Sequence, residues 1–320
     1  MDKTPPITTT DGLEGLENAS SLRGEEDQQE LPVDESILGQ VQSLSPRFLD
    51  PEEVTYDGSI RLGSGTTGVV YRGRYRGLDV ACKVFHDDCQ EARELLNQEV
   101  SIWREFRHPC IVTCFGGVKS PGSPIMVNEL CAYGSLSSAM MTFPAKWTTK
   151  MKVKALHNCA CAMSFLHHSS VVYRDLKPDN LLVTSLDSLS SVVCKLDCSD
   201  FARRTSEGKR LTLGVGTPIF MAPEMMSSTS YTNKADVYSF GVTIAAVWNR
   251  CDMESLYPEI SSFIQLCEAV TKGVRPKVVN VEEMPPQLKT LMENCWDENP
   301  DNRPCFDLIV ERLERLLETL

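Results

Sequence analysis

The apolar pattern of the chain changes its period near Gly134, and this change limits the fold more than any other feature. Before Gly134, short runs alternate between apolar and polar residues around glycines, which predicts strands. After it, apolar residues recur every three or four positions, which predicts helices. We therefore expect an α+β chain with a small β-rich lobe over about 54–131 and a larger α-helical lobe over about 132–320.

The same patterns give approximate bounds for the elements. Strands are expected at 60–62, 69–75, 79–85, 111–117 and 125–130. Helices are expected at 88–106, 151–167, 234–248, 261–270, 286–295 and 306–320. No run reaches the ~18 apolar residues that a transmembrane helix needs, and the first ten residues lack the apolar stretch of a signal peptide.

The acidity of the chain is concentrated at its start. The formal net charge is −12, and residues 1–50 contribute −8 through eleven acidic and three basic side chains. This segment is rich in polar residues and has no aromatic residue before Phe48, so we expect 1–53 to be a disordered acidic tail. The domain that follows, 54–320, is then close to neutral for its size. The overall charge argues against nucleic-acid binding.

Thirteen cysteines are scattered from Cys82 to Cys305 without a Cys-x-x-Cys pair. Two pairs have a looser, three-residue gap, but both pairs lie in apolar, strand-like stretches. We therefore interpret them as packing residues and expect reduced thiols in a cytoplasmic protein.

One carboxylate stands out within the helix expected at 88–106. At roughly 100° per residue, its apolar side chains fall on one arc, and Glu99 lies in the middle of that arc. A carboxylate within an apolar stripe is costly unless it is paired. Lys83 ends the strand Val80-Ala81-Cys82-Lys83 and is a suitable partner. A Lys–Glu pair that holds nucleotide phosphates would account for both residues.

A glycine-rich segment supports a phosphate-binding role. Residues 63–70 read Gly-Ser-Gly-Thr-Thr-Gly-Val-Val, a G-x-G-x-x-G-x-V pattern. A strand follows these glycines, whereas a dinucleotide-binding turn would enter a helix. The pattern therefore favours a hairpin whose backbone N–H groups approach phosphates, and a plain hairpin turn is the alternative.

The segment 173–180, Tyr-Arg-Asp-Leu-Lys-Pro-Asp-Asn, is the most specific. Here the sequence resembles the eukaryotic protein kinase family, and the resemblance implies the two-lobed protein kinase fold. In that family Asp175 would accept and orient the substrate hydroxyl, Lys177 would neutralise the γ-phosphate, and Asn180 would bind Mg2+. Lys83 and Glu99 would complete the catalytic set.

Further motifs follow in the family's order over about residues 54–320. Residues 200–202, Asp-Phe-Ala, stand where D-F-G is expected, and 222–224 match A-P-E. Asp236 is similar to the aspartate that anchors the catalytic loop. Arg303 is similar to the arginine that pairs with the A-P-E glutamate.

The resemblance also assigns the ATP site. Val70, Ala81 and Leu182 would enclose the adenine, and Asn128 would lie at the rear of its pocket. Glu129 to Cys131 would form the linking strand whose backbone grips the adenine edge. The full set of expected nucleotide contacts is Leu62, Gly63, Ser64, Gly65, Thr66, Thr67, Gly68, Val70, Ala81, Lys83, Glu129, Cys131 and Leu182.

The sequence departs from the family pattern in three places. Tyr173 replaces the usual histidine of H-R-D, so its polar contact is expected to relocate. Ala202 replaces the D-F-G glycine and should restrict positive φ. The spacing from Asn180 to Asp200 is longer than usual, so Asp197 competes with Asp200 as the second Mg2+ ligand, although Phe201 favours Asp200. The extra residues, around 185–191, should form a surface hairpin.

Together these features predict a protein kinase that transfers the γ-phosphate of ATP to Ser or Thr of protein substrates. Lys177 and Gly216-Thr217 resemble Ser/Thr kinases, and Cys295-Trp296 with Arg303-Pro304 resembles the tyrosine-kinase-like group. The alternative is a pseudokinase scaffold, which Tyr173 and Ala202 favour.

Arg174 beside the catalytic aspartate suggests control by phosphorylation. An upstream kinase could modify Thr205, Ser206 or Thr212, whereas Thr217 is expected only to shape the substrate platform. Deletion of residues 1–50 is expected to leave the ATP site intact.

Overall fold

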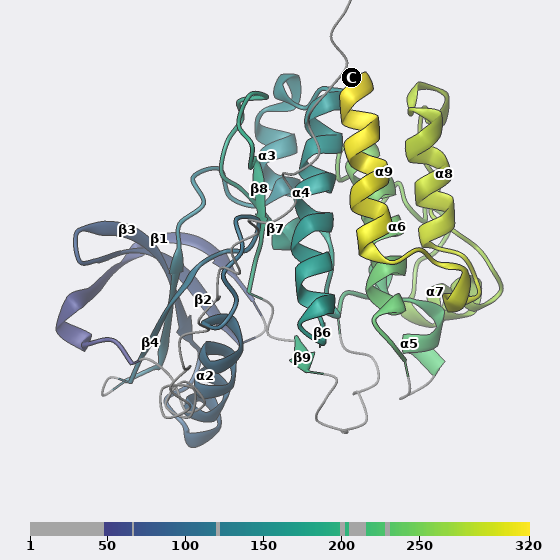
Figure 1. Cartoon of the computed structure of the whole chain (residues 1–320). Helices are drawn as coiled ribbons and strands as arrows, with labels where there is room; N and C mark the ends of the chain where they lie inside the picture. Colours follow the sequence, from purple (N-terminus) through teal and green to yellow (C-terminus); the bar gives the residue numbers. More distant parts are fainter. Residues whose placement is uncertain (1–47, 66, 120–121, 199–201, 205–215, 228–230) are drawn as a thin grey trace, which may run out of the picture. The chain divides into compact units, whose positions relative to one another are not determined.

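A five-stranded antiparallel sheet begins the described part of this computed structural model, which covers residues 48–65, 67–119, 122–198, 202–204, 216–227 and 231–320 (Figure 1). The strand order is β1-β2-β3-β5-β4. The strands are β1 (Val54–Ser64), β2 (Gly68–Tyr75), β3 (Leu78–Phe85), β4 (Cys114–Val118) and β5 (Ile125–Glu129). The sheet and the helices after it belong to one unit, Ser45–Leu320, and the α+β prediction is confirmed.

The register of the central strands separates two faces of this sheet. Directly opposed residues of antiparallel strands share a face, and neighbours along a strand alternate. Cys82 lies opposite Val127, and both are buried in one apolar cluster. Lys83 lies opposite Met126, so these two residues face the other side. Lys83 contacts Glu99 of helix α2 (Gln90–Trp103), so this second face is directed toward α2.

Helix α2 forms where its apolar periodicity predicts, although it is shorter at both ends than expected. Leu96, Val100 and Trp103 are almost fully buried. Glu99 lies among them with 3% of its surface exposed, so the predicted position of a carboxylate within an apolar stripe is confirmed.

The rest of the described chain is mainly helical. Its helices are α3 (Leu136–Thr142), α4 (Thr149–His168), α5 (Pro223–Ser227), α6 (Lys234–Trp248), α7 (Phe263–Thr271), α8 (Pro286–Cys295) and α9 (Phe306–Thr319). Short strands form two small sheets: β6 (Val171–Val172) with β9 (Arg203–Arg204), and β7 (Leu181–Val183) with β8 (Cys194–Leu196). Among the described residues, no helix has the length and apolar character for a membrane crossing.

Helix α6 is the centre of the helical region. Its residues from Ala235 to Trp248 are buried, which agrees with a helix that is apolar on all sides. Helices α4 and α9 run side by side (Figure 1). Hydroxyl N-caps set several helix starts: Ser135 caps α3, Thr148 caps α4 and Ser262 caps α7.

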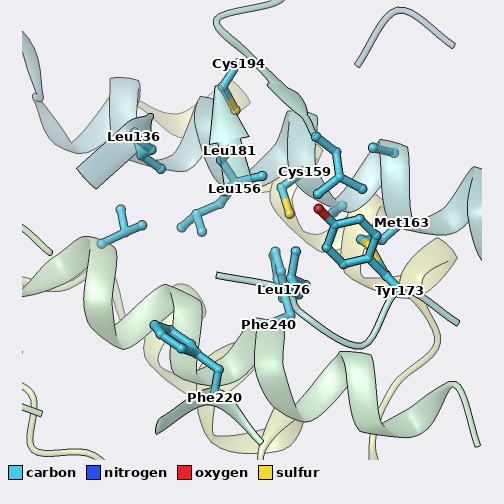
Figure 2. Packing of buried hydrophobic residues seen from close by; sticks show 14 of the residues in the cluster. Leu136, Leu156, Cys159, Met163, Tyr173, Leu176, Leu181, Cys194, Phe220 and Phe240 are labelled. Carbon is cyan, nitrogen blue, oxygen red and sulfur yellow. The ribbon is translucent and has the colours of Figure 1, made fainter. Parts of the chain in front are cut away.

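The core of the helical region extends directly under the polar segment 173–180. Figure 2 shows the Tyr173 ring beside Cys159 and Met163, with Leu176 near Phe240. The thirteen cysteines all lie in the described part of the chain and are free thiols. Burial raises the pKa of Cys82 and of Cys110 to about 11, so both remain protonated at neutral pH.

Candidate active site

The glycine-rich segment forms the turn between β1 and β2. The Gly65 N–H donates to the Gly68 carbonyl at 2.9 Å and closes this turn. A Cβ added at Gly68 would lie 2.4 Å from the Val84 carbonyl oxygen, whereas a Cβ at Gly63 would meet nothing within 4 Å. Gly68 is therefore required for packing against β3, and Gly63 leaves an open stretch of backbone. Thr66 lies outside the described residues.

The Lys83 side chain reaches inward from β3 to α2, as the sequence predicts. Its Nζ lies 2.9 Å from Glu99 Oε2 and 3.2 Å from Oε1. The two side chains are 10% and 4% exposed. Because the pair is held away from bulk water, it fixes a cation on the face of the sheet that is directed toward α2.

The Asp175 carboxylate is surrounded by donors. Oδ1 accepts from the Thr217 N–H and from Thr217 Oγ1, both at 2.9 Å. Oδ2 accepts from Asn180 Nδ2 at 2.9 Å and lies 2.9 Å from Lys177 Nζ. Lys177 Nζ also donates to Thr217 Oγ1 at 2.5 Å. Four residues thus hold one buried carboxylate in a fixed orientation.

The Asn180 side chain is oriented by the same aspartate. Its Nδ2 donates to the Asp175 carbonyl at 2.7 Å and to the Asp175 carboxylate. Both amide hydrogens are then used, which leaves the amide oxygen as the atom that can bind a hard cation.

Asp236 at the start of α6 holds the catalytic loop from below. Its Oδ2 accepts from the Tyr173 N–H at 2.9 Å, and its Oδ1 accepts from the Arg174 N–H at 2.8 Å. His167 Nε2 lies 2.9 Å from Oδ2. Arg174 has φ of 69°, a conformation that costs a non-glycine residue energy. The Asp236 contacts offset that cost immediately before Asp175.

Tyr173 fills the place where the family has histidine. Its ring is fully buried and lies edge-on to Trp103 of α2 at 6.2 Å between centroids. Burial raises the pKa of the phenol well above its usual value, so the hydroxyl stays protonated. It donates to the Asp197 carbonyl at 2.9 Å. The polar contact of this position is therefore made to the chain that follows β8.

The two candidates for the second metal ligand differ in what is known of them. Asp200 lies outside the described residues, as do Thr205, Ser206 and Thr212. The Asp197 N–H donates to the Asn180 carbonyl at 2.9 Å, so Asp197 lies beside Asn180. Its Oδ1 accepts from the Cys198 N–H at 2.8 Å.

Thr217 has a larger part in the site than the sequence suggested. It contacts both Asp175 and Lys177, although it was expected only to shape the substrate platform. Gly216 allows this contact because its φ is 113° and a Cβ there would lie 2.5 Å from the Arg174 carbonyl oxygen. The Gly-Thr pair before A-P-E was the available signal.

The A-P-E glutamate and the late arginine meet as the resemblance implies. Arg303 is fully buried, and its two terminal nitrogens lie 2.5 and 3.1 Å from the Glu224 oxygens. A two-toothed pair of this kind fixes orientation as well as distance. It ties α5 to the segment before α9.

The expected adenine-side residues line the edge where β5 leaves the sheet. Val70 and Ala81 are half-buried, and neither belongs to an apolar cluster formed by the described residues. Leu182 of β7 is half-buried, and Cys131 is 7% exposed. The other expected nucleotide contacts lie around the turn: Leu62, Ser64 and Gly65 are exposed, and Thr67 is half-buried.

Sequence reasoning missed one ion pair at this edge. Lys195 Nζ of β8 lies 2.6 and 2.8 Å from the Glu129 oxygens, and Glu129 Oε2 also accepts from the Thr113 N–H at 3.1 Å. The Glu129 side chain thus joins the five-stranded sheet to β8. A nucleotide could then use its backbone, but its carboxylate already has partners.

The sheet with a buried Lys–Glu pair, followed by helices that hold an Asp–Lys–Asn loop, defines the class of two-lobed phosphotransferases. A family model described as protein tyrosine and serine/threonine kinase matches residues 58–313. The chain belongs to this protein kinase family.

The chain is similar to several kinases of Dictyostelium discoideum. It is 33% identical to the dual specificity protein kinase shkA over 86% of this chain and 51% of the relative. It is 30% identical to the dual specificity protein kinase shkC over 85% and 53%. It is 32% identical to the RGS domain-containing serine/threonine-protein kinase A over 83% and 23%. The chain thus spans about half or less of the length of these relatives.

Proposed function

We propose that this chain transfers the γ-phosphate of ATP to Ser and Thr hydroxyls of protein substrates. The observation that carries the proposal is the Asp175 carboxylate, which is held by Lys177, Asn180 and Thr217 within one hydrogen-bonded group. The membership of the chain in the protein kinase family supports this assignment.

The proposed mechanism is positioning combined with charge neutralisation. Lys83, fixed by Glu99, would hold the α- and β-phosphates near the open backbone at Gly63. Asp175 would orient the substrate hydroxyl and accept its proton as the bond to phosphorus forms. Lys177 would neutralise charge on the transferred phosphoryl group.

Mg2+ fits the donor set that the chain offers. The Asn180 amide oxygen is a suitable hard ligand because both amide hydrogens are used by Asp175. We propose Asp200 as the second ligand, with Asp197 as the competing candidate. When bound, Mg2+ would screen the negative charge of the phosphates.

The adenine would lie against Val70, Ala81 and Leu182, which are half-buried apolar side chains. The backbone of Glu129 and Cys131 would supply the hydrogen bonds to its edge. This arrangement gives a flat apolar site with polar groups at one end, which suits a purine.

The test compares phosphotransfer from Mg-ATP to a generic protein substrate by the wild type and by Asp175→Asn. We expect Asp175→Asn to lower kcat at least ~100-fold because the hydroxyl loses its proton acceptor. ATP affinity should change little. Asp301→Asn is the matched control, since Asp301 is exposed and outside the site. Equal background rates from both proteins would contradict the enzyme proposal, and ATP binding without turnover by the wild type would favour the pseudokinase scaffold.

Residue specificity and regulation are part of the proposal. Two of the named relatives are called dual specificity kinases, so the phosphorylated products should be analysed for phosphotyrosine as well. We expect phosphoserine and phosphothreonine. Activation by an upstream kinase at Thr205, Ser206 or Thr212 and a cytoplasmic location also remain predictions.

A further inference from the structure

Asn128, near the end of β5, carries a buried oxygen that the fold does not use. The side chain is 8% exposed, and its Oδ1 accepts no hydrogen bond from the part of the chain that the structure describes. Buried polar atoms in proteins almost always have a partner, so a site that keeps one unpaired weakens the fold. Such a residue is retained most easily when a ligand supplies the missing donor.

The strand register directs this side chain to the nucleotide side of the sheet. Asn128 lies directly opposite Ala81, two residues before Lys83 on β3. Opposed residues share a face, as do alternate residues of a strand. Asn128, Ala81 and Lys83 therefore lie on the face from which Lys83 contacts Glu99. Val70 belongs to the same face, because it lies opposite Lys83.

The neighbouring polar groups at this edge are already engaged. The Glu129 carboxylate accepts from Lys195 and from the Thr113 N–H, and the Glu129 N–H donates to the Thr113 carbonyl. Val70 and Ala81 offer only apolar surface. The Asn128 oxygen is thus a hydrogen-bond acceptor beside a flat apolar wall.

We propose that Asn128 Oδ1 accepts a hydrogen bond from the 6-amino group of adenine and is a specificity-determining residue of the nucleotide site. This proposal rests on the proposed function. The 6-amino group is the hydrogen-bond donor of the adenine base, whose ring nitrogens accept. A base with hydrogen at position 6 could fill the same apolar space but would leave the oxygen unpaired.

A comparison of two nucleotides with two proteins tests the proposal. The affinities of ATP and of purine riboside triphosphate, which lacks only the 6-amino group, are measured with Mg2+ on the full chain and on Asn128→Leu. Leucine has a similar size and no polar atom. We expect Asn128→Leu to narrow the preference for ATP over purine riboside triphosphate by about three- to tenfold. The affinity for purine riboside triphosphate itself should not fall.

A second measurement separates recognition from a structural role. Without nucleotide, Asn128→Leu should melt at a higher temperature than the wild type, because it removes a buried unpaired oxygen. An unchanged preference between the two nucleotides, or a lower melting temperature, would overturn the proposal while leaving the kinase assignment intact. Failure of the wild type to bind either nucleotide would reject both.

Discussion

At the scale of single residues, the Asp175 carboxylate has little capacity left for a substrate. Each ionised oxygen accepts about two hydrogen bonds, and both oxygens have two partners here. A substrate hydroxyl must therefore displace one of them. Lys177 is the partner that can leave most easily, because its flexible ammonium can move to the phosphoryl group.

Thr217 should matter for turnover more than for stability. We predict that Thr217→Val lowers kcat by about ten- to a hundredfold, since Asp175 Oδ1 loses one of its two donors and Lys177 loses an acceptor. Thr217→Ser, which keeps the hydroxyl, should retain most of the activity. Steady-state kinetics with varied ATP and substrate measures the effect. Equal activity of the valine and serine variants would contradict this role.

The difference between Thr217 and its partners shows what local sequence can predict. Asp175, Lys177 and Asn180 lie within six positions, so a single motif identified them and the structure brings them together. The Thr217 N–H is 42 positions from Asp175, and its contact depends on the backbone conformation at Gly216. A long-range contact of this kind is determined by the fold, so a linear motif cannot reveal it.

At the scale of elements, the two ends of the glycine-rich turn should respond differently to a methyl group. We predict that Gly68→Ala destabilises the fold by ~1–3 kcal/mol, because the new Cβ would clash with the Val84 carbonyl of β3. Gly63→Ala meets open space and should change stability by less than ~0.5 kcal/mol.

Chemical denaturation of the two variants measures these stabilities, and ATP titration provides the second readout. If Gly63 approaches phosphates through its backbone, Gly63→Ala should weaken ATP binding without unfolding the domain. Equal destabilisation by both substitutions would show that the packing difference between the two positions is wrong.

The buried ion pair couples helix α2 to strand β3. We predict that Glu99→Leu alone lowers the free energy of unfolding by about 3 kcal/mol, since it leaves the Lys83 charge buried without this partner. The double variant Lys83→Met, Glu99→Leu should recover part of that stability. Neither variant should regain phosphotransfer, because each loses a charge that the site needs.

Denaturation curves and activity assays on the single and double variants test this coupling. Recovery of stability without recovery of activity would show that the pair is kept for function. A double variant that is less stable than Glu99→Leu would contradict the interpretation. Glu94→Leu is a suitable control, because Glu94 lies on the same helix and is exposed.

Elements with long periodic patterns were the most predictable. Helices α6 and α8 have the predicted bounds, 234–248 and 286–295. Helix α3 was missed because seven residues are too few to show a period. The strand expected at 111–117 begins only at Cys114, and Ile111 instead forms an isolated bridge to Leu196. That bridge joins distant segments, and alternation within one segment carries no signal for it.

At the scale of the whole molecule, the transition from tail to domain involves apolar packing as well as charge. We expected the domain to begin at Val54. Leu49 is already 5% exposed, and its N–H donates to the Gly117 carbonyl of β4 at 2.7 Å. Phe48 forms a bridge to Gly117, and Lys119 Nζ lies 3.7 Å from the centre of its ring. The last residues before Asp50 therefore cover an edge of the sheet.

A truncation series can locate this transition. Deletion of residues 1–47 removes most of the acidic charge and should leave both the melting temperature and ATP affinity unchanged. Deletion of residues 1–50 also removes Phe48 and Leu49, so it should cost ~2–3 kcal/mol of stability through lost apolar burial and one backbone hydrogen bond. ATP affinity should still survive, because Lys83 and Asp175 keep their partners. The double substitution Phe48→Ser, Leu49→Ser in the full chain is the matched control, since it removes the apolar contacts but keeps the acidic tail. If deletion of 1–47 alone lowered stability as much as deletion of 1–50, residues upstream of Phe48 would have to contact the domain.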